Sequence, residues 1–210
     1  MTDQDTTIVE EAEQLAKQGQ FDSALSRLET GSDTLNTNPA ALYIRAVCQR
    51  SLGLRTDALE TLKLLLRVNP DHVRGYQEIG HIHVAAKNAE KAIQGYAEAV
   101  RRDPAMLSSW QPLTKLYRMV GDTANQQMAE QRVMELQALP EALVAVKSAL
   151  NQNNLVMADR ICRSFLKSNK QHVEALRLLA EIADRARIID DAEFFLDSAV
   201  NFRSEEHTSE

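Results

Sequence analysis

A small residue returns along this chain at a constant interval of about 34 residues, and this regularity leaves few possible folds. Ala24, Ala58 and Ala92 are equally spaced, and Ala158 and Ala192 are separated by the same interval. A fixed period of this length indicates stacked structural repeats. The interval between Ala92 and Ala158 is about twice as long, which leaves room for one further repeat. The sequence therefore predicts about six tandem repeats.

A second set of markers divides each repeat into two helices. Leu42, Tyr76 and Trp110 recur at the same interval, near the start of the first helix of a repeat. Glycines mark the turn that follows this helix in three repeats, at Gly19, Gly53 and Gly121. Helical periodicity on both sides of each turn predicts an all-α, right-handed solenoid. We expect repeats at 5–38, 39–72, 73–106, 107–138, 139–172 and 173–202.

Small residues at fixed positions are expected where the two helices of a repeat approach closely. We expect Ala46 to face Ala58 and Gly80 to face Ala92, with larger residues such as Tyr96 filling the space toward the next repeat. A single repeat cannot bury its apolar face alone, so stacking must complete the core.

Composition agrees with a helical protein. Only 5% of the residues are aromatic, and the 7 Gly and 5 Pro are too few for the many turns of an all-β chain. Cys48 and Cys162 lie in apolar segments and are expected to be buried, unpaired hydrophobes. No apolar run approaches the ~18 residues of a membrane span. The acidic N-terminus lacks the pattern of a secretory signal, so we expect a cytoplasmic protein.

The clearest repeat, residues 73–106, resembles the tetratricopeptide repeat family. The family pattern is Trp/Tyr-x2-Leu-Gly-x2-Tyr, then Ala-x3-Phe-x2-Ala, then Pro. This chain matches it with Tyr76, Ile79, Gly80, His83, Ala92, Tyr96, Ala99 and Pro104. The resemblance implies a helix–turn–helix solenoid that binds protein partners on its inner, concave face.

Two repeats depart from this pattern. Gln126 replaces the expected alanine in 107–138, and Pro112 lies in the first helix of that repeat. If Ser108 caps this helix, Pro112 falls in the first turn, where proline is tolerated. In 139–172 the turn reads NQNN, without glycine.

Motifs for catalysis are missing from the sequence. It contains no phosphate-binding loop, nucleophile elbow, HExxH or CxxC motif. His81 and His83 are two positions apart and so point in different directions on a helix, and His83 is expected to be a core histidine. We expect no cofactor, metal or catalytic residue within this chain, while the activity of a longer parent protein stays open.

The resemblance implies a binding face lined by the first helix of each repeat. The candidate residues on this face are Tyr43, Val47, Arg50, Arg74, Gln77, His81, Gln111, Lys115, Arg118 and Lys147. Several are basic or carry amides, so an extended acidic peptide or a partner domain is one expected ligand. A solvated groove without a dedicated ligand is the alternative. A chaperone carboxylate clamp is disfavoured, because Val9 and Glu13 stand where it needs Lys and Asn.

Charge is unevenly distributed along the chain. The net charge is −6, but residues 39–121 contain 12 Lys/Arg and 7 Asp/Glu between two acidic ends. This excess of +5 is too small and scattered to predict nucleic-acid binding.

The C-terminal end carries two further hypotheses. Residues 203–210, RSEEHTSE, read as the in-frame translation of a sequencing adapter, so we interpret them as a non-native polar tail. The preceding repeat, with its EALRLLAEIA and DDAE segments, resembles the stretch before the catalytic domain of bacterial tetratricopeptide-repeat sulfotransferases. That resemblance implies an alternative, in which the chain is the N-terminal region of such an enzyme and its partner is a missing C-terminal domain.

Overall fold

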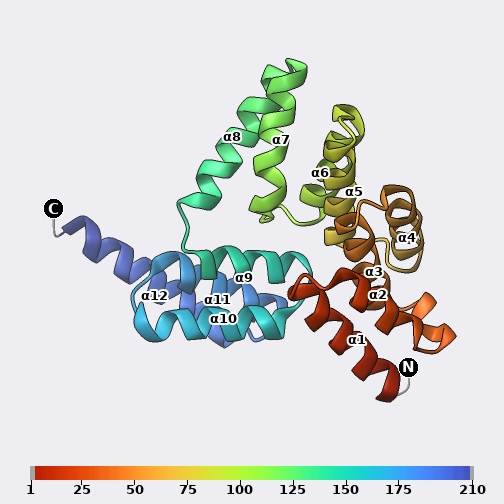
Figure 1. Cartoon of the computed structure of the whole chain (residues 1–210). Helices are drawn as coiled ribbons and strands as arrows, with labels where there is room; N and C mark the ends of the chain where they lie inside the picture. Colours follow the sequence, from red (N-terminus) through yellow and green to blue (C-terminus); the bar gives the residue numbers. More distant parts are fainter. Residues whose placement is uncertain (1–2, 209–210) are drawn as a thin grey trace. The chain divides into compact units, whose positions relative to one another are not determined.

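The computed structural model describes the backbone of residues 3–208 and the side chains up to residue 202 (Figure 1). Within these residues every regular element is a helix, and no strand is present. The predicted all-α solenoid fold is therefore confirmed.

The helices alternate between two sets along the chain. The first helix of each pair, called the A helix here, is α1 (Asp3–Lys17), α3 (Pro39–Ser51), α5 (Val73–Ala85), α7 (Leu107–Val120), α9 (Glu141–Asn151) or α11 (Val173–Arg185). The second, called the B helix, is α2 (Phe21–Glu29), α4 (Arg55–Val68), α6 (Ala89–Arg102), α8 (Thr123–Gln137), α10 (Leu155–Ser168) or α12 (Ile189–Thr208). A short 3₁₀ helix, η1 (Asp33–Asn36), follows α2.

The last helix extends beyond the predicted end of the final repeat. α12 continues past Phe202 to Thr208, into the segment interpreted as a non-native tail. Residues 209–210 and the side chains from 203 onward lie outside the described part of the structure. The origin of this tail therefore stays a hypothesis.

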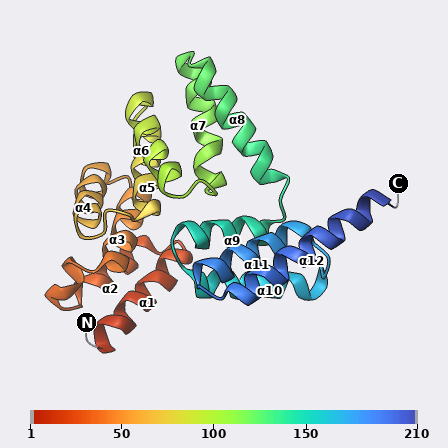
Figure 2. The same cartoon turned by 180° about the vertical axis from the view of Figure 1, so that it is seen from behind.

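The chain forms two compact units. The first contains residues up to Arg101 together with 112–126, and the second contains 102–111 and the residues from Gln127 onward. In the second unit, α9, α10, α11 and α12 lie side by side in both Figure 1 and Figure 2, and α11 contacts both α10 and α12.

One backbone conformation closes every A helix. The residue that ends the turn after the helix has a positive φ in all six pairs, at Gly19 (77°), Gly53 (81°), Lys87 (56°), Gly121 (75°), Asn153 (54°) and Arg187 (60°). The interval between successive members is constant, except that the step from Gly121 to Asn153 is two positions shorter. We use this residue as the origin of each repeat and call it the turn residue. Three of the six are not glycine, and one of these, Asn153, lies in the NQNN turn that the sequence shows.

The turn residue lets the chain satisfy carbonyl groups at the end of the helix. The N–H of Gly19 donates to the Ala16 carbonyl (3.0 Å), and the N–H of Gln20 donates to the Leu15 carbonyl (2.9 Å). This is the Schellman arrangement, which ends many helices. The second of these bonds recurs at Leu54, Asn88, Asp122, Asn154 and Ile188, each donating to the carbonyl five positions earlier at 2.8–2.9 Å.

Small residues follow the turn at a fixed distance and pack in the core. Five positions after the turn residue, Ala24, Ala58, Ala92 and Ala158 are fully buried and Ala192 is nearly so. Ala46 and Ala58 share one apolar cluster with Leu42 and Leu62, as expected from close A and B helices. Cys48 and Cys162 are free and buried, and burial raises the pKa of each thiol to about 11.

The closest approach in the third pair differs from the prediction. The residue that requires a glycine at position 80 is Tyr96 and not Ala92. A Cβ on Gly80 would lie 2.8 Å from the Tyr96 ring. A Cβ on Gly95 would lie 2.6 Å from the Gly80 nitrogen and 3.0 Å from the Tyr76 carbonyl oxygen. The backbones of α5 and α6 therefore touch at Gly80 and Gly95.

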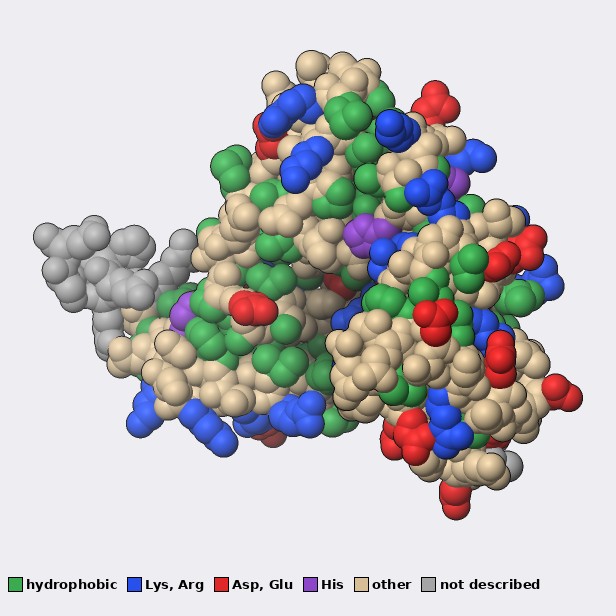
Figure 3. Space-filling model, viewed as in Figure 1, with side chains coloured by type: hydrophobic (Ala, Val, Ile, Leu, Met, Phe, Trp, Pro, Cys, Tyr) green, Lys and Arg blue, Asp and Glu red, His purple; other side chains and the backbone are tan. Residues whose placement is uncertain are grey.

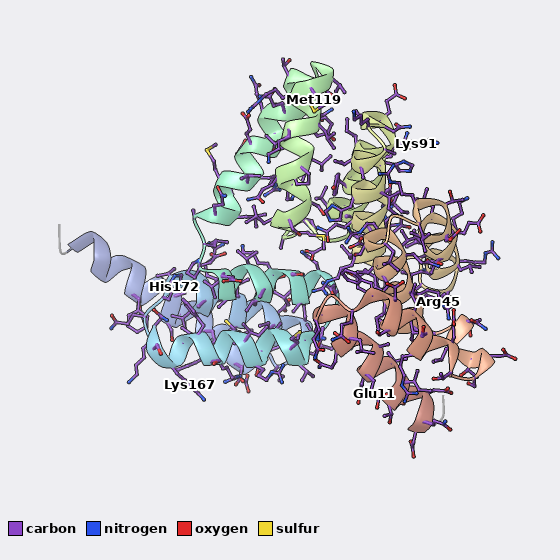
Figure 4. The ribbon with its side chains drawn as sticks, in the orientation of Figure 1. Glu11, Arg45, Lys91, Met119, Lys167 and His172 are labelled. Atoms are coloured by element: carbon purple, nitrogen blue, oxygen red, sulfur yellow. The ribbon has the colours of Figure 1, made fainter. Side chains whose placement is uncertain are left out.

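Side-chain caps start several helices. The Asn38 Oδ1 accepts from the N–H of Ala41 (3.0 Å), the His72 Nδ1 from Gly75 (3.0 Å) and the His172 Nδ1 from Ala175 (3.3 Å). His172 lies at the start of α11, near the end of α10 (Figure 4). Histidine is an unusual cap, because only its neutral ring can accept this bond.

A buried carboxylate joins the loop between α6 and α7 to α9 within the second unit. Asp103 is buried, and its oxygens accept from the N–H of Ala105 (3.0 Å), the amide of Asn151 (2.8 Å) and the hydroxyl of Ser148. The sequence indicates only a helix stop here, since Pro104 follows.

Pro112 lies deeper in α7 than predicted. The helix begins at Leu107, so Ser108 is inside it and does not cap it, and Pro112 is an interior residue. Proline has no N–H, so the helix lacks one backbone bond at this point.

Replacing Gly95 with alanine is expected to destabilise the first unit. The new methyl group would meet backbone atoms of α5, which cannot move as a side-chain end can. Overpacking of this kind costs about 1–3 kcal/mol, which exceeds the gain in helix propensity. The free energy of unfolding, measured by urea denaturation, should fall for Gly95→Ala and stay nearly constant for the control Gln94→Ala, on the same helix. Equal values for the two variants would contradict this packing.

Replacing His72 with asparagine is expected to flatten the pH dependence of stability. Burial and, secondarily, the Arg74 charge lower the pKa of His72 below its ordinary value of 6.5. Its cap is therefore fully present above about pH 6.5, and stability falls as the pH drops below this value. An asparagine side chain would keep an acceptor at every pH. The loss of unfolding free energy between about pH 7.5 and pH 5 should be smaller in His72→Asn than in the parent, and identical losses would exclude the cap.

Candidate functional site

A cluster of polar and charged side chains surrounds Glu78 in the first unit. Its members are Glu78, Arg50, Tyr43, Arg74, His81 and Tyr96, and we call them the Glu78 cluster. Tyr43 and Arg50 come from α3, Arg74 and His81 come from α5 with Glu78, and only Tyr96 comes from a B helix, α6. Successive A helices thus provide most of this site.

The centre of the cluster is an ion pair between neighbouring A helices. The Arg50 Nε donates to the Glu78 Oε2, and the Glu78 side chain is only 8% exposed while that of Arg50 is 33% exposed. A carboxylate this deeply buried requires a partner, since an isolated buried charge is costly. Arg50 therefore neutralises the buried Glu78 carboxylate, although its own side chain is partly exposed.

A second contact links the A and B helices of the third pair. The His81 Nδ1 lies 2.7 Å from the Tyr96 hydroxyl, and the two rings meet edge to face with centroids 5.4 Å apart. Burial lowers the pKa of His81, and it raises the pKa of Tyr96 to about 12 with a further contribution from Glu78. Both groups are therefore neutral at physiological pH, and the pair serves as hydrogen-bonded support beneath the surface.

The outer side of the cluster is formed by Tyr43 and Arg74. Tyr43 is half-buried, packs against the His72 ring with centroids 5.1 Å apart, and lies close enough to the exposed Arg74 side chain for the guanidinium charge to act on its hydroxyl. Burial raises the pKa of Tyr43, and the neighbouring Glu78 acts in the same direction. The hydroxyl therefore stays protonated beside an accessible guanidinium.

The other predicted face residues divide between the two units. Lys115 and Arg118 are exposed on α7 in the first unit, while Gln111 is exposed in the second. Lys147 is paired with Glu174 at 2.8 Å, so part of its charge is neutralised. Val47 is half-buried.

Two predicted positions need correction. Gln77 is buried, so its amide lies beneath the surface and does not line it. His83 is half-buried, not a full core residue, and burial followed by the Lys91 charge lowers its pKa. Arg45 also projects from α3 (Figure 4), but it donates to the Asn36 Oδ1 at 3.2 Å and is not part of the cluster.

Glu78, the centre of the cluster, is not among the residues predicted from the sequence. It lies nine positions before the turn residue Lys87, where α3 and α11 place the buried apolar residues Ile44 and Leu178. α1 places the exposed Glu10 at the same position, so the sequence alone does not show that Glu78 is a buried, paired carboxylate.

The same alignment shows a change of charge along the A helices. At positions −13, −10, −6 and −3 from the turn residue, α5 places Arg74, Gln77, His81 and Val84. α11 places Glu174, Arg177, Glu181 and Asp184 at the same positions. The last A helix, α11, is therefore mainly acidic at positions where α5 is basic or neutral. The predicted basic face does not extend to α11.

The described residues meet the requirements of neither a metal-binding cluster nor a membrane-spanning helix. Within the described residues, no group of three or more His, Cys, Asp or Glu side chains is placed to hold a metal ion. Among those residues, no helix combines the length and apolar character needed to cross a membrane. Figure 3 shows Lys and Arg side chains in separate groups interspersed with Asp and Glu.

Comparisons with known proteins agree with the repeat architecture. Residues 15–79 match the tetratricopeptide repeat family model. The PilW type IV pilus biogenesis factor superposes with a TM-score of 0.57 at 14% identity, covering 93% of this chain and 91% of that one. A tetratricopeptide repeat protein from Parabacteroides merdae gives 0.56 at 15% identity, covering 97% and 86%. MamA gives 0.54 at 13% identity, covering 94% and 96%.

These similarities define the fold and not a function. The three structures share no more than 15% identity with this chain, and the family match covers less than half of it. No curated protein matches the chain.

The Arg50–Glu78 pair is expected to couple α3 to α5 energetically. Arg50→Met would leave a buried carboxylate unpaired and should cost about 2 kcal/mol of unfolding free energy, the cost of an unsatisfied buried acceptor. In a double-mutant cycle with Glu78→Gln, the coupling should reach about 1–2 kcal/mol. The exposed pair Glu13–Lys17 serves as the control, with an expected coupling below about 0.5 kcal/mol. Equal couplings in the two cycles would contradict a structural role for Glu78.

Proposed function

We propose that this chain is a protein-interaction scaffold whose A-helix face, at the Glu78 cluster, binds an extended peptide segment with acidic side chains. The observation that carries the proposal is the exposed Arg74 guanidinium beside the protonated Tyr43 hydroxyl. Together they offer hydrogen-bond donors to a carboxylate, and guanidinium is well suited to such a ligand.

The rest of the cluster supports this pair of donors. Arg50 is occupied by Glu78, and His81 by Tyr96, so both hold the helices in place and do not compete for the ligand. A site whose side chains are fixed before binding loses less conformational entropy when the ligand arrives. Lys115 and Arg118 on α7 would add longer-range attraction for an acidic segment.

The scaffold role also agrees with the general use of helical repeat folds, which present long surfaces formed by successive repeats. The alternative of a repeat region attached to a sulfotransferase domain rests on sequence resemblance alone, and no contact or comparison favours it.

The proposal is tested by reversing a charge on the face and off it. Arg74→Glu and the control Lys63→Glu change the net charge equally, and Lys63 is exposed on the B helix α4. Binding to an array of short extended peptides, with alternating Glu or alternating Lys, would be measured at low and physiological salt. We expect the parent to prefer Glu peptides, with about tenfold weaker binding in Arg74→Glu and less than about twofold in Lys63→Glu.

Arg50 is deliberately left unchanged in this experiment, because Arg50→Glu would place a second carboxylate against buried Glu78 and unfold the site. If the Glu and Lys peptides bind equally, or if the two variants lose the same affinity, an acidic ligand at Arg74 is excluded.

A further inference from the structure

The last B helix exposes an apolar position that four of the other five repeats bury; in the fourth, α8 has Glu130 at this position. Nine positions after the turn residue, Leu28 is 2% exposed, Leu62 0%, Tyr96 1% and Cys162 0%. The equivalent residue of α12, Leu196, is 49% exposed. Its chemistry is that of the core positions, but its surroundings are those of a surface.

In the inner repeats an α-helix covers this position. Leu62 packs in one cluster with Ile82 and Ile79 of α5, the next A helix. Cys162 lies with its sulfur 3.2 Å from the Ala175 carbonyl oxygen of α11, again the next A helix. The surface around Leu196 is therefore equivalent to the surface that a following A helix covers in the inner repeats.

This surface forms a groove between α11 and α12. Its volume is about 520 Å³, and its lining includes the apolar residues Leu178, Ile189 and Leu196 together with the acidic residues Glu181, Asp184 and Glu193. Ile189 is 66% exposed, so apolar surface extends along the groove. A volume of this size is typical of a binding site and can receive several side chains from one face of a helix.

The charged side chains of the groove indicate which kind of partner would bind there. Glu181 is paired with Arg185 at 2.6 Å, whereas Asp184 and Glu193 have no ion pair among the described side chains. The groove contains four acidic residues, and the basic residues in its lining are Lys147 and Arg177. Both of these already contact Glu174, at 2.8 and 3.5 Å. The open charges are therefore negative, and they favour a basic partner.

End-to-end stacking of a second copy is disfavoured by the same charges. The A helix that a second copy would present is α1, on which Asp3, Glu10, Glu11 and Glu13 are exposed against one Lys, while Asp5 is buried. Placing α1 on this groove would bring acidic residues against acidic residues.

We infer that the groove between α11 and α12 binds an amphipathic α-helix of another protein, with a Leu-rich stripe that packs on Leu196 and Lys or Arg residues that meet Asp184 and Glu193. This is a second surface, separate from the Glu78 cluster, and it recognises the opposite charge.

Two synthetic helical peptides, each about five helical turns long, provide the probe. Both carry Leu at positions i, i+3, i+4 and i+7, and they differ only in having Lys or Glu beside this stripe. Fluorescence anisotropy with the full chain should show saturable binding of the Lys peptide, and binding of the Glu peptide at least about tenfold weaker.

Variants locate the binding site. Leu196→Asp should weaken the Lys peptide at least about tenfold, and Val156→Asp, an 83% exposed control on α10, should change it less than about twofold. Glu193→Lys should reduce the preference for Lys over Glu. Leu196 and Val156 are both exposed, so neither substitution is expected to unfold the chain. Leu196→Asp should also leave acidic-peptide binding at Arg74 unchanged, which keeps the two proposals distinguishable.

Three results would overturn the inference: equal affinity for the two peptides, equal effects of Leu196→Asp and Val156→Asp, or no saturable binding. Sedimentation velocity tests whether a second copy of this chain occupies the groove. If the parent self-associates and Leu196→Asp makes it monomeric, the occupant is another copy of this chain and the basic helix is excluded.

Discussion

One backbone turn is repeated six times and sets the geometry of every helical pair. After each A helix a residue with positive φ lets the next N–H return to a carbonyl five positions earlier, as Gln20 does to Leu15. This bond satisfies a helix end that would otherwise need water, and it directs the B helix back along the A helix. Because the turn recurs at nearly constant intervals, every residue of a repeat has a fixed structural place. The burial of the alanine five positions after the turn, as at Ala24, Ala58 and Ala92, follows from this distance.

The same alignment lets one fold present two kinds of surface. Three A-helix positions that carry Arg74, Gln77 and His81 in the third repeat carry Glu174, Arg177 and Glu181 in the sixth. In the third repeat only Arg74 of these three side chains is exposed, since Gln77 is buried and His81 is hydrogen-bonded to Tyr96, whereas Arg177 and Glu181 are exposed in the sixth. The proposed acidic-peptide site and the proposed basic-helix groove are therefore independent features of one scaffold.

The sequence predicts the helices well because spacing alone indicates them, as for Ala24 and Ala58. It does not predict which residues adopt positive φ at Lys87 or Arg187, since an L-residue there is stabilised by the surrounding helices and not by its own preference. The predicted basic face is incomplete for a related reason. Side-chain type indicates charge, but only the packing of α3 on α5 shows that buried Glu78 neutralises part of it.

Amide hydrogen exchange measured by NMR tests whether the turn closes in all six pairs. The N–H groups that follow the turn residue are those of Gln20, Leu54, Asn88, Asp122, Asn154 and Ile188. If the recurrent bond forms in every repeat, all six amides exchange much more slowly than in an unstructured peptide, including the three that follow a non-glycine turn residue. Free exchange at Asn88, Asn154 or Ile188 would show that these turns do not close, and the alignment of the repeats would then have no common structural origin.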